Sequence, residues 1–181
     1  PMIRGHAGVI MDFDFYPFNE NLIITCSEDT TLRLWNIPEP LTEDITEPLA
    51  KLSGHSKKVN LVQFHPSAES IVASAGFEGT VRVWNVESQS SVFAIKGVTE
   101  SFSSLEWNYN GSQILTASRD KTIRIGDPRT STWVQEFKGH EGPKPQKAVW
   151  LGNEGYIATV GFSKTYAREM YLWNISNLSK P

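Results

Sequence analysis

A pair of markers recurs four times along the chain and constrains its fold more than any other feature. Gly-His dipeptides stand at residues 5–6, 54–55 and 139–140, and residues 97–98 (Gly-Val) are a degenerate copy. At 30, 30, 29 and 34 residues beyond each Gly, a second column contains Trp35, Trp84, Gly126 and Trp173. Because the Gly marker returns every 42–49 residues with a nearly constant distance to the second, the chain is an array of structural repeats.

The segments between the markers have the character of β-strands. Each repeat contains an apolar run, a turn with Pro or Gly, a second β-branched run, and a third strand in which apolar and polar residues alternate. The alternation is clearest at residues 31–35 and 80–84. A weaker fourth strand precedes each following marker, and no segment has apolar residues at helical spacing over ten or more positions. The sequence therefore predicts an all-β chain.

Four-stranded units that repeat in this way, with these dipeptides, resemble the WD40 family of β-propellers. The resemblance covers the whole chain and implies a partial WD40 propeller, with about 3.75 four-stranded antiparallel blades of a seven-bladed ring. We expect one domain over residues 1–181. Its blades should lie near residues 7–53, 56–96 and 99–138, with an incomplete fourth near 141–175.

Polar side chains recur in the same columns as the markers. Each set combines a His, a Ser or Thr, an acid and a Trp, and the members are His6, Thr25, Asp29 and Trp35; His55, Ser74, Glu78 and Trp84; Thr116 and Asp120; and His140, Thr159 and Trp173. The third repeat has Val98 and Gly126 in the His and Trp columns, and the fourth has no acid in its column.

These sets have two interpretations. A hydroxyl, an imidazole and a carboxylate would also suit nucleophilic hydrolysis. An active site is needed only once, however, whereas this set recurs in each blade and degrades gradually. In WD40 proteins such a set forms a hydrogen-bond chain from Trp through Ser or Thr and His to the acid, which pairs polar groups that would be costly to bury alone. We therefore expect structural tetrads, no catalytic residue and no enzyme.

Composition argues against several other classes of protein. The 181 residues carry 17 Lys and Arg against 20 Asp and Glu, which is too balanced for binding nucleic acid through bulk charge. The single cysteine excludes an internal disulfide framework and a multi-cysteine zinc site. No apolar run approaches the roughly 18 residues of a membrane helix, and no Gly-rich phosphate loop opens a helix. We expect no metal, no cofactor, no nucleic-acid partner and no transmembrane segment.

Residues that are not general to WD40 repeats narrow the family further. The run Gly-His-Glu-Gly-Pro-Lys-Pro occupies residues 139–145, and Gly-Phe-Ser-Lys occupies residues 161–164 of an inserted fourth repeat. Gly126 replaces the Trp of the third repeat, and Asp-Pro-Arg follows at 127–129. Together these features resemble the coronin family of actin-associated WD40 proteins. By that resemblance, the chain corresponds to roughly the second to fifth blades of the propeller.

The resemblance to coronins implies a non-catalytic scaffold module. It would belong to a cytoplasmic protein that binds filamentous actin and regulates the organisation of the actin cytoskeleton. The implied partners are filamentous actin and actin-regulatory proteins, and the full-length parent is expected to be oligomeric through a coiled coil that this chain does not contain. The alternative is a generic WD40 adaptor that recruits a peptide partner to a multiprotein complex.

Basic residues are concentrated toward the C-terminal part of the sequence. Residues 1–114 contain 7 bases and 14 acids, whereas residues 115–181 contain 10 bases and 6 acids. Because actin filaments are strongly acidic, a basic face would attract and hold them. An ordinary solvated surface is the competing interpretation for any one of these residues. The candidate actin contact consists of Arg119, Lys121, Lys144, Lys147, Lys164 and Arg168.

Overall fold

The computed structural model describes residues 1–181 as four antiparallel sheets with no helix. The first sheet contains β1 (Ile10–Phe15), β2 (Leu22–Ser27), β3 (Thr31–Asn36) and β4 (Ala50–Ser53). The second contains β5 (Val59–Phe64), β6 (Ile71–Gly76), β7 (Thr80–Asn85) and β8 (Ser90–Ile95). The third contains β9 (Phe102–Trp107), β10 (Ile114–Ser118), β11 (Thr122–Asp127) and β12 (Thr132–Lys138). The last has three strands, β13 (Lys147–Leu151), β14 (Tyr156–Phe162) and β15 (Arg168–Asn174).

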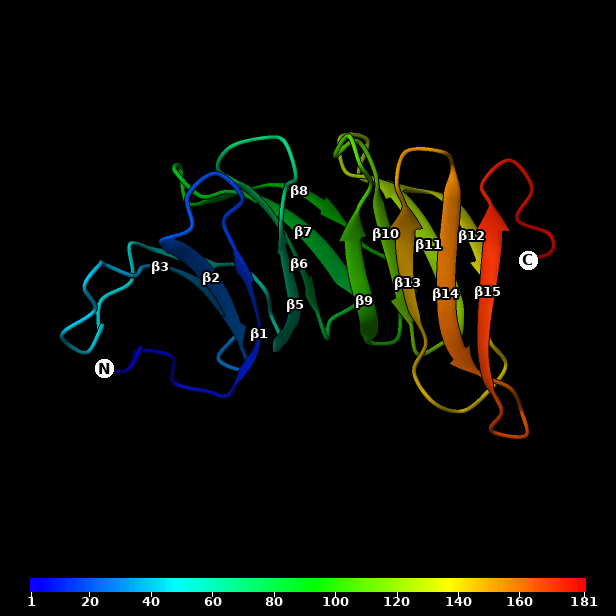
Figure 1. Cartoon of the computed structure of the whole chain (residues 1–181), viewed down its shortest axis with the longest axis horizontal. Helices are drawn as coiled ribbons and strands as arrows, with labels where there is room; N and C mark the ends of the chain where they lie inside the picture. Colours follow the sequence, from blue (N-terminus) through cyan, green and yellow to red (C-terminus); the bar gives the residue numbers. More distant parts are fainter.

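The sheets stand side by side as blades, from the blue β1–β4 blade to the orange and red β13–β15 blade (Figure 1). Within each blade the strands pair in chain order. The first strand of every blade lies at a sheet edge and contacts the first strand of the next blade, so that β1, β5, β9 and β13 run in a row. The expectation of an all-β partial WD40 propeller is confirmed.

Apolar side chains fill the spaces between neighbouring blades. One buried cluster joins the first two blades and includes Ile24, Leu52, Phe64 and Trp84. A second cluster joins the second and third blades, and a third joins the third and fourth around Phe137 and Trp173. Each blade therefore buries its faces only against its immediate neighbours, as expected for a repeat architecture.

Side chains of one blade bind the free edge of the first strand of the next. The amides of Val62 and Phe64 in β5 donate to the carboxylates of Asp12 and Asp14 in β1, at 3.1 and 2.8 Å. Burial raises the pKa of both carboxyl groups above the ordinary value, although each accepts hydrogen bonds from backbone amides. An edge-strand amide left unpaired inside the protein would be costly, so these contacts fix the first blade against the second.

The same device recurs at the two following interfaces. The Trp107 amide in β9 donates to Oε1 of Gln63 at 2.8 Å, and the Ala148 amide in β13 donates to Oγ of Ser104 at 3.0 Å. His65 adds a second link between the second and third blades. Its Nδ1 accepts from the Ser67 and Ala68 amides, which leaves Nε2 to donate to the Gly111 carbonyl at 3.0 Å.

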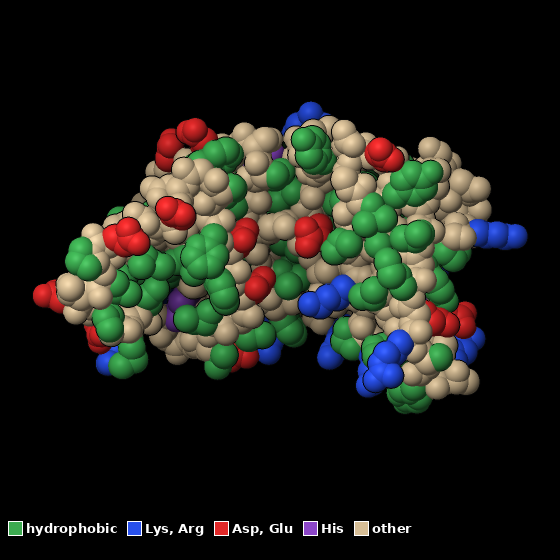
Figure 2. All heavy atoms as spheres, in the orientation of Figure 1, with side chains coloured by type: hydrophobic (Ala, Val, Ile, Leu, Met, Phe, Trp, Pro, Cys, Tyr) green, Lys and Arg blue, Asp and Glu red, His purple; other side chains and the backbone are tan.

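The outward faces of the first and last blades carry exposed apolar side chains. Phe13 and Phe15 of the first blade are 56% and 54% exposed. On the last blade, Val160 pairs with Met170 across β14 and β15, and Leu172 lies beside them. Figure 2 shows hydrophobic side chains gathered over β13–β15. Apolar patches of this kind on a folded chain mark surfaces that bind other protein surfaces.

The isolated 181-residue chain is therefore expected to self-associate, because both end faces present apolar surface to water. Sedimentation velocity across a concentration series should show species larger than 20.3 kDa. The double variant Val160→Glu and Leu172→Glu should shift the distribution toward monomer. Tyr109→Glu, which changes an exposed aromatic residue in a turn, is the matched control and should leave it unchanged. A monodisperse wild-type monomer at all concentrations contradicts this expectation.

Candidate functional site

In the first two blades the Gly of the Gly-His marker lies against the Trp ring of the same blade. An added Cβ at Gly5 would lie 2.8 Å from the Trp35 ring, and one at Gly54 would lie 3.1 Å from the Trp84 ring. Glycine is thus required for the close approach of the backbone to the indole. The His that follows then lies within hydrogen-bond distance of the second strand and of the turn after it.

In the first blade the four expected residues form one continuous chain. Trp35 Nε1 donates to Thr25 Oγ1 at 2.9 Å, and Thr25 Oγ1 lies 2.8 Å from His6 Nε2. His6 Nδ1 lies 2.8 Å from Asp29 Oδ2, which also accepts the Ala7 amide. The carboxylate therefore joins the tetrad to the loop ahead of β1.

The second blade has the same chain with a longer acid. Trp84 Nε1 donates to Ser74 Oγ at 2.8 Å, and Ser74 Oγ lies 2.7 Å from His55 Nε2. His55 Nδ1 bonds to Oε1 of Glu78. Ser74 is fully buried and His55 is 5% exposed, so removal of any partner would leave a polar group without water.

The ionised acid determines which nitrogen of each His donates and which accepts. An ionised carboxylate can only accept, so Nδ1 of each His carries the proton and Nε2 accepts from the hydroxyl. Burial lowers the pKa of His6, which favours this neutral imidazole. Burial alone would raise the pKa of Asp29, but hydrogen bonds from Thr31, His6 and the Ala7 amide hold it well below its ordinary range.

The fourth blade contains an acid that the sequence did not reveal. His140 Nε2 lies 3.0 Å from Thr159 Oγ1, which accepts Trp173 Nε1 at 2.9 Å. His140 Nδ1 lies 3.3 Å from Glu169 Oε2, a residue of β15. The acid column of this repeat is empty, as the sequence indicated, but Glu169 supplies a carboxylate from the strand instead of the turn. The Tyr171 ring stacks on His140, with 4.2 Å between the ring centroids. The Tyr171 hydroxyl donates to Oε2 of Glu169 at 2.8 Å.

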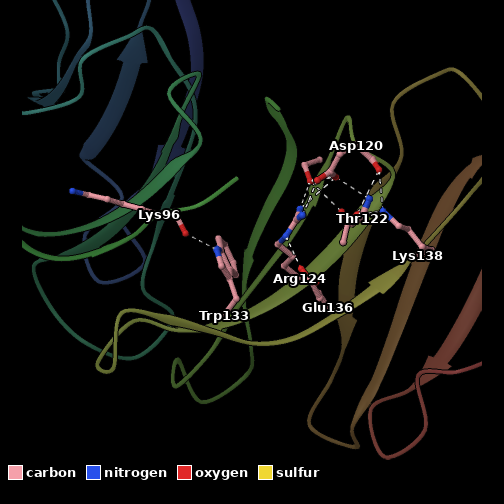
Figure 3. Close-up of polar contacts among 8 residues, drawn as sticks. Lys96, Asp120, Thr122, Arg124, Trp133, Glu136 and Lys138 are labelled. Carbon is pink, nitrogen blue, oxygen red and sulfur yellow. Dashed lines mark hydrogen bonds and ion pairs between the residues drawn. The ribbon is translucent and has the colours of Figure 1, made fainter. Parts of the chain in front are cut away.

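The third blade replaces the tetrad with an ion pair. Its Thr116 hydroxyl is buried without a hydrogen-bond partner, because Val98 and Gly126 supply neither the imidazole nor the indole. Arg124 points from β11 toward the β10–β11 turn (Figure 3), where Nη2 lies 2.7 Å from Asp120 Oδ2 and Nη1 lies 2.8 Å from Ser118 Oγ. Burial opposes ionisation, but the bonds from Arg124 and Ser118 lower the pKa of Asp120 to about 2.

A tryptophan from another column takes the space of the missing one. Trp133 of β12 lies over Gly126, where an added Cβ would be 3.1 Å from the indole ring. Its Nε1 donates to the Lys96 carbonyl of the second blade at 2.9 Å (Figure 3). Gly126 is therefore required by Trp133, and the loss of Trp from the column is compensated by a contact between blades.

The hydroxyl groups of the three complete tetrads are closed to a substrate. Thr25, Ser74 and Thr159 are at most 5% exposed, and each oxygen already accepts an indole N–H. A nucleophile must be reachable by the atom that it attacks. The arrangement instead pairs a Trp, a hydroxyl, a His and an acid inside each blade, which stabilises the loops ahead of the first strands.

The structure separates the six candidate contact residues into two locations. Five lie in or next to loops of the third and fourth blades: Arg119, Lys121, Lys144, Lys164 and Arg168. All five are exposed, and Figure 2 shows Lys and Arg side chains grouped at the lower edge beside the last blade. Lys147 begins β13 and lines a different groove, together with the carboxylates of Asp12, Asp14 and Glu106. Lys147 thus faces acidic side chains of the chain itself.

The structure contains no group of three or more His, Cys, Asp or Glu side chains placed to hold a metal ion. Nor does it contain a helix of the length and apolar character that crossing a membrane demands.

Comparison with known proteins identifies relatives over the whole chain. The family model described as "WD domain, G-beta repeat" matches residues 2–36, 46–85 and 89–127. Coronin-A of Dictyostelium discoideum is 45% identical and covers 100% of this chain. A coronin-like protein of Schizosaccharomyces pombe is 37% identical over 99% of it. The chain spans only 40% and 30% of these two relatives.

A solved structure also matches nearly the whole chain. The crystal structure of the WD40 domain of Toxoplasma gondii coronin superposes with a TM-score of 0.94 at 36% identity. It covers 99% of this chain, which in turn covers 47% of that domain. The resemblance to coronins expected from residues 139–145 and 161–164 is therefore confirmed.

Replacing His55 with Ala is expected to destabilise the fold by about 1–3 kcal/mol for each buried group left unpaired. The groups at risk are the Ser74 hydroxyl and the Glu78 carboxylate. Urea unfolding followed by tryptophan fluorescence measures the change. Ser56→Ala, an exposed neighbour, is the control and should change stability by no more than about 0.5 kcal/mol. Equal unfolding midpoints for both variants would refute the structural role of the tetrad.

The lowered pKa of Asp120 gives a pH dependence of stability. Because the folded pKa is below the unfolded value of about 3.9, the ion pair stabilises the fold above that value and is lost as pH falls toward about 2. Asp120→Asn should lower the urea midpoint at pH 7, and the difference from wild type should shrink from pH 4 to pH 3. Glu154→Gln, an exposed control, should show no such trend. A constant Asp120→Asn difference contradicts the assignment.

Proposed function

The chain belongs to the WD40 repeat family and matches coronins over its whole length, and on this basis we propose that it is a module of a coronin-like protein that binds filamentous actin. In this role it helps to organise the actin cytoskeleton in the cytoplasm. Its partners would be actin filaments and the proteins that regulate them. The module acts as a scaffold and catalyses no reaction.

The observation that carries this proposal is the position of the basic side chains. Arg119 and Lys121 occupy the turn at the end of β10, Lys144 lies in the loop before β13, and Lys164 lies between β14 and β15. Loops held by rigid blades commonly carry binding residues. Several cations on one edge attract an acidic filament and orient it, an effect that salt weakens.

The scaffold role is supported by what the tetrads do chemically. Their hydroxyl groups are buried and occupied, and the same set recurs in three blades. A repeated internal network stabilises a fold, whereas a catalytic constellation is needed once and must be open to its substrate.

Filament co-sedimentation tests the proposal directly. The chain and full-length Coronin-A of Dictyostelium discoideum, as a positive control, are pelleted with filamentous actin over a salt series. We expect both to bind, and binding to fall as salt rises. Failure of the chain to pellet at low salt, while Coronin-A pellets, would contradict actin binding by this module. Capture of the chain by peptides but not by filaments would favour the adaptor function.

Reversing the loop charges should weaken filament binding. The triple variant Lys144→Glu, Lys164→Glu and Arg168→Glu places acids opposite an acidic filament and should lower affinity about tenfold or more while flattening the salt dependence. Lys147→Glu alone should have little effect, because Lys147 lies in the groove with Asp12 and Glu106.

A matched variant separates local contact from total charge. It reverses three exposed bases of the first two blades, Lys51, Lys57 and Lys96. Binding should remain close to wild type in this control. Equal losses in the two triple variants would assign the effect to net charge and would exclude the loop surface as the contact.

A further inference from the structure

A polar cavity lies between the third and fourth blades, beside the basic loops. Its volume is about 560 Å³. It is formed by residues 99–100 ahead of β9, by residues 118–121 at the end of β10 and in the turn after it, and by residues 140 and 142–146 ahead of β13. The lining consists of charged and polar side chains with Gly and Pro, and it contains no aliphatic or aromatic hydrophobic residue.

The cavity is present where the third blade has lost its His. In the first blade the imidazole of His6 and the Ala7 amide both bond to Asp29 and cover it. In the third blade Val98 is packed into the apolar cluster with the second blade, and no hydrogen bond joins the Asp120 carboxylate to the loop ahead of β9. The side of Ser118 and Asp120 that a His would occupy therefore lines open space.

The cavity has a surplus of positive charge. Arg119, Lys121 and Lys144 line it against Glu100 and Asp120, and the Asp120 charge is neutralised by Arg124 at 2.7 Å. The Arg119 side chain is exposed and its guanidinium makes no hydrogen bond or ion pair within the chain. Lys121 donates only to the Glu141 carbonyl, and Lys144 lies over the Phe162 ring at 4.8 Å. Three cations are thus available to an incoming anion.

A buried amide in the same cavity lacks a partner. Gln146 is 3% exposed, and its Oε1 accepts the His140 amide at 2.8 Å. This bond fixes the side-chain orientation, and Nε2 is left without an acceptor. A buried donor without a partner is rare and costly. Because Gln146 lines the cavity, an acceptor that displaced the atoms covering Nε2 would satisfy it.

We propose that this cavity binds a carboxylate side chain of an acidic peptide segment on a protein partner. Arg119, Lys121 and Lys144 attract the segment, and the Gln146 amide donates to a carboxylate oxygen that reaches the base. The proposal rests on the proposed function for its natural partner, the acidic filament, and adds a defined pocket to the broad basic edge.

A hexaglutamate peptide, labelled with a fluorophore, is the probe. Fluorescence anisotropy with the full chain should show saturable binding. The double variant Arg119→Glu and Lys144→Glu should weaken it about tenfold or more. Lys57→Glu with Lys180→Glu reverses two exposed bases outside the cavity and is the control. Equal weakening by both double variants overturns the pocket, as does the absence of binding.

The role of Gln146 has its own test. Gln146→Glu keeps an oxygen for the His140 amide and removes the donor, so peptide affinity should fall while circular dichroism stays unchanged. In the wild-type chain, the side-chain amide resonance of Gln146 should shift on peptide addition. If the Gln146→Glu variant unfolds, the wild-type resonance is the test. A Gln146 amide signal that does not shift on peptide addition overturns the role given to Gln146.

Two further measurements separate the possible ligands and proposals. Inorganic phosphate at matched ionic strength should not displace hexaglutamate, and displacement would assign the pocket to phosphate groups instead. Filament co-sedimentation is run on the same variants. Peptide binding without filament binding would refute the proposed function and leave the pocket in place. Filament binding unaffected by Arg119→Glu and Lys144→Glu would refute this pocket as part of the filament contact.

Discussion

The free edge of each blade's first strand is the constraint on which this architecture depends. A sheet edge presents N–H groups that need partners, and the sheets of a propeller have no neighbouring strand to offer at their centre. The structure meets this need with side chains from the preceding blade, Asp12 and Asp14 at one interface, then Gln63 and Ser104 at the next two. Because each acceptor must reach across to the next strand, these contacts fix blade spacing as well as satisfying the amides.

Four of the aspartates form two groups whose pKa values are shifted in opposite directions. The hydrogen-bond donors to Asp12 and Asp14 are backbone amides, and burial outweighs them and raises the pKa of each. Asp29 and Asp120 are also partly buried, but His, Thr or Arg donors outweigh burial and lower the pKa. Protonation at low pH therefore removes the cost of burying charged Asp12 and Asp14 in the first blade. It also removes the stabilising bonds that ionised Asp29 and Asp120 accept in the turns of their blades. The two pairs of carboxyl groups therefore contribute to the pH dependence of stability with opposite signs.

Most of the fold followed from the sequence because the repeated columns report contacts within one blade. His6, Thr25, Asp29 and Trp35 recur at fixed spacing, since each joins neighbouring strands of its own sheet. What the sequence did not reveal depends on register after an insertion or on contacts between blades. Glu169 reaches His140 from a strand, Trp133 bonds to the Lys96 carbonyl, and Lys147 faces another blade's acids. None of these positions recurs in the other repeats, so the repeated pattern of the sequence could not predict them.

The third blade shows why such departures are tolerated and why they matter. Stability in a repeat array is carried by each unit and its immediate neighbours, so one blade can lose its tetrad while the blades on either side keep theirs. The Arg124–Asp120 pair and the hydrogen bond from Trp133 to Lys96 hold this blade instead, although the Thr116 hydroxyl stays unpaired. Without an imidazole above Asp120, the space between two blades remains open and polar. A position released from its structural role is thereby free to bind, and it lies among the most basic loops of the chain.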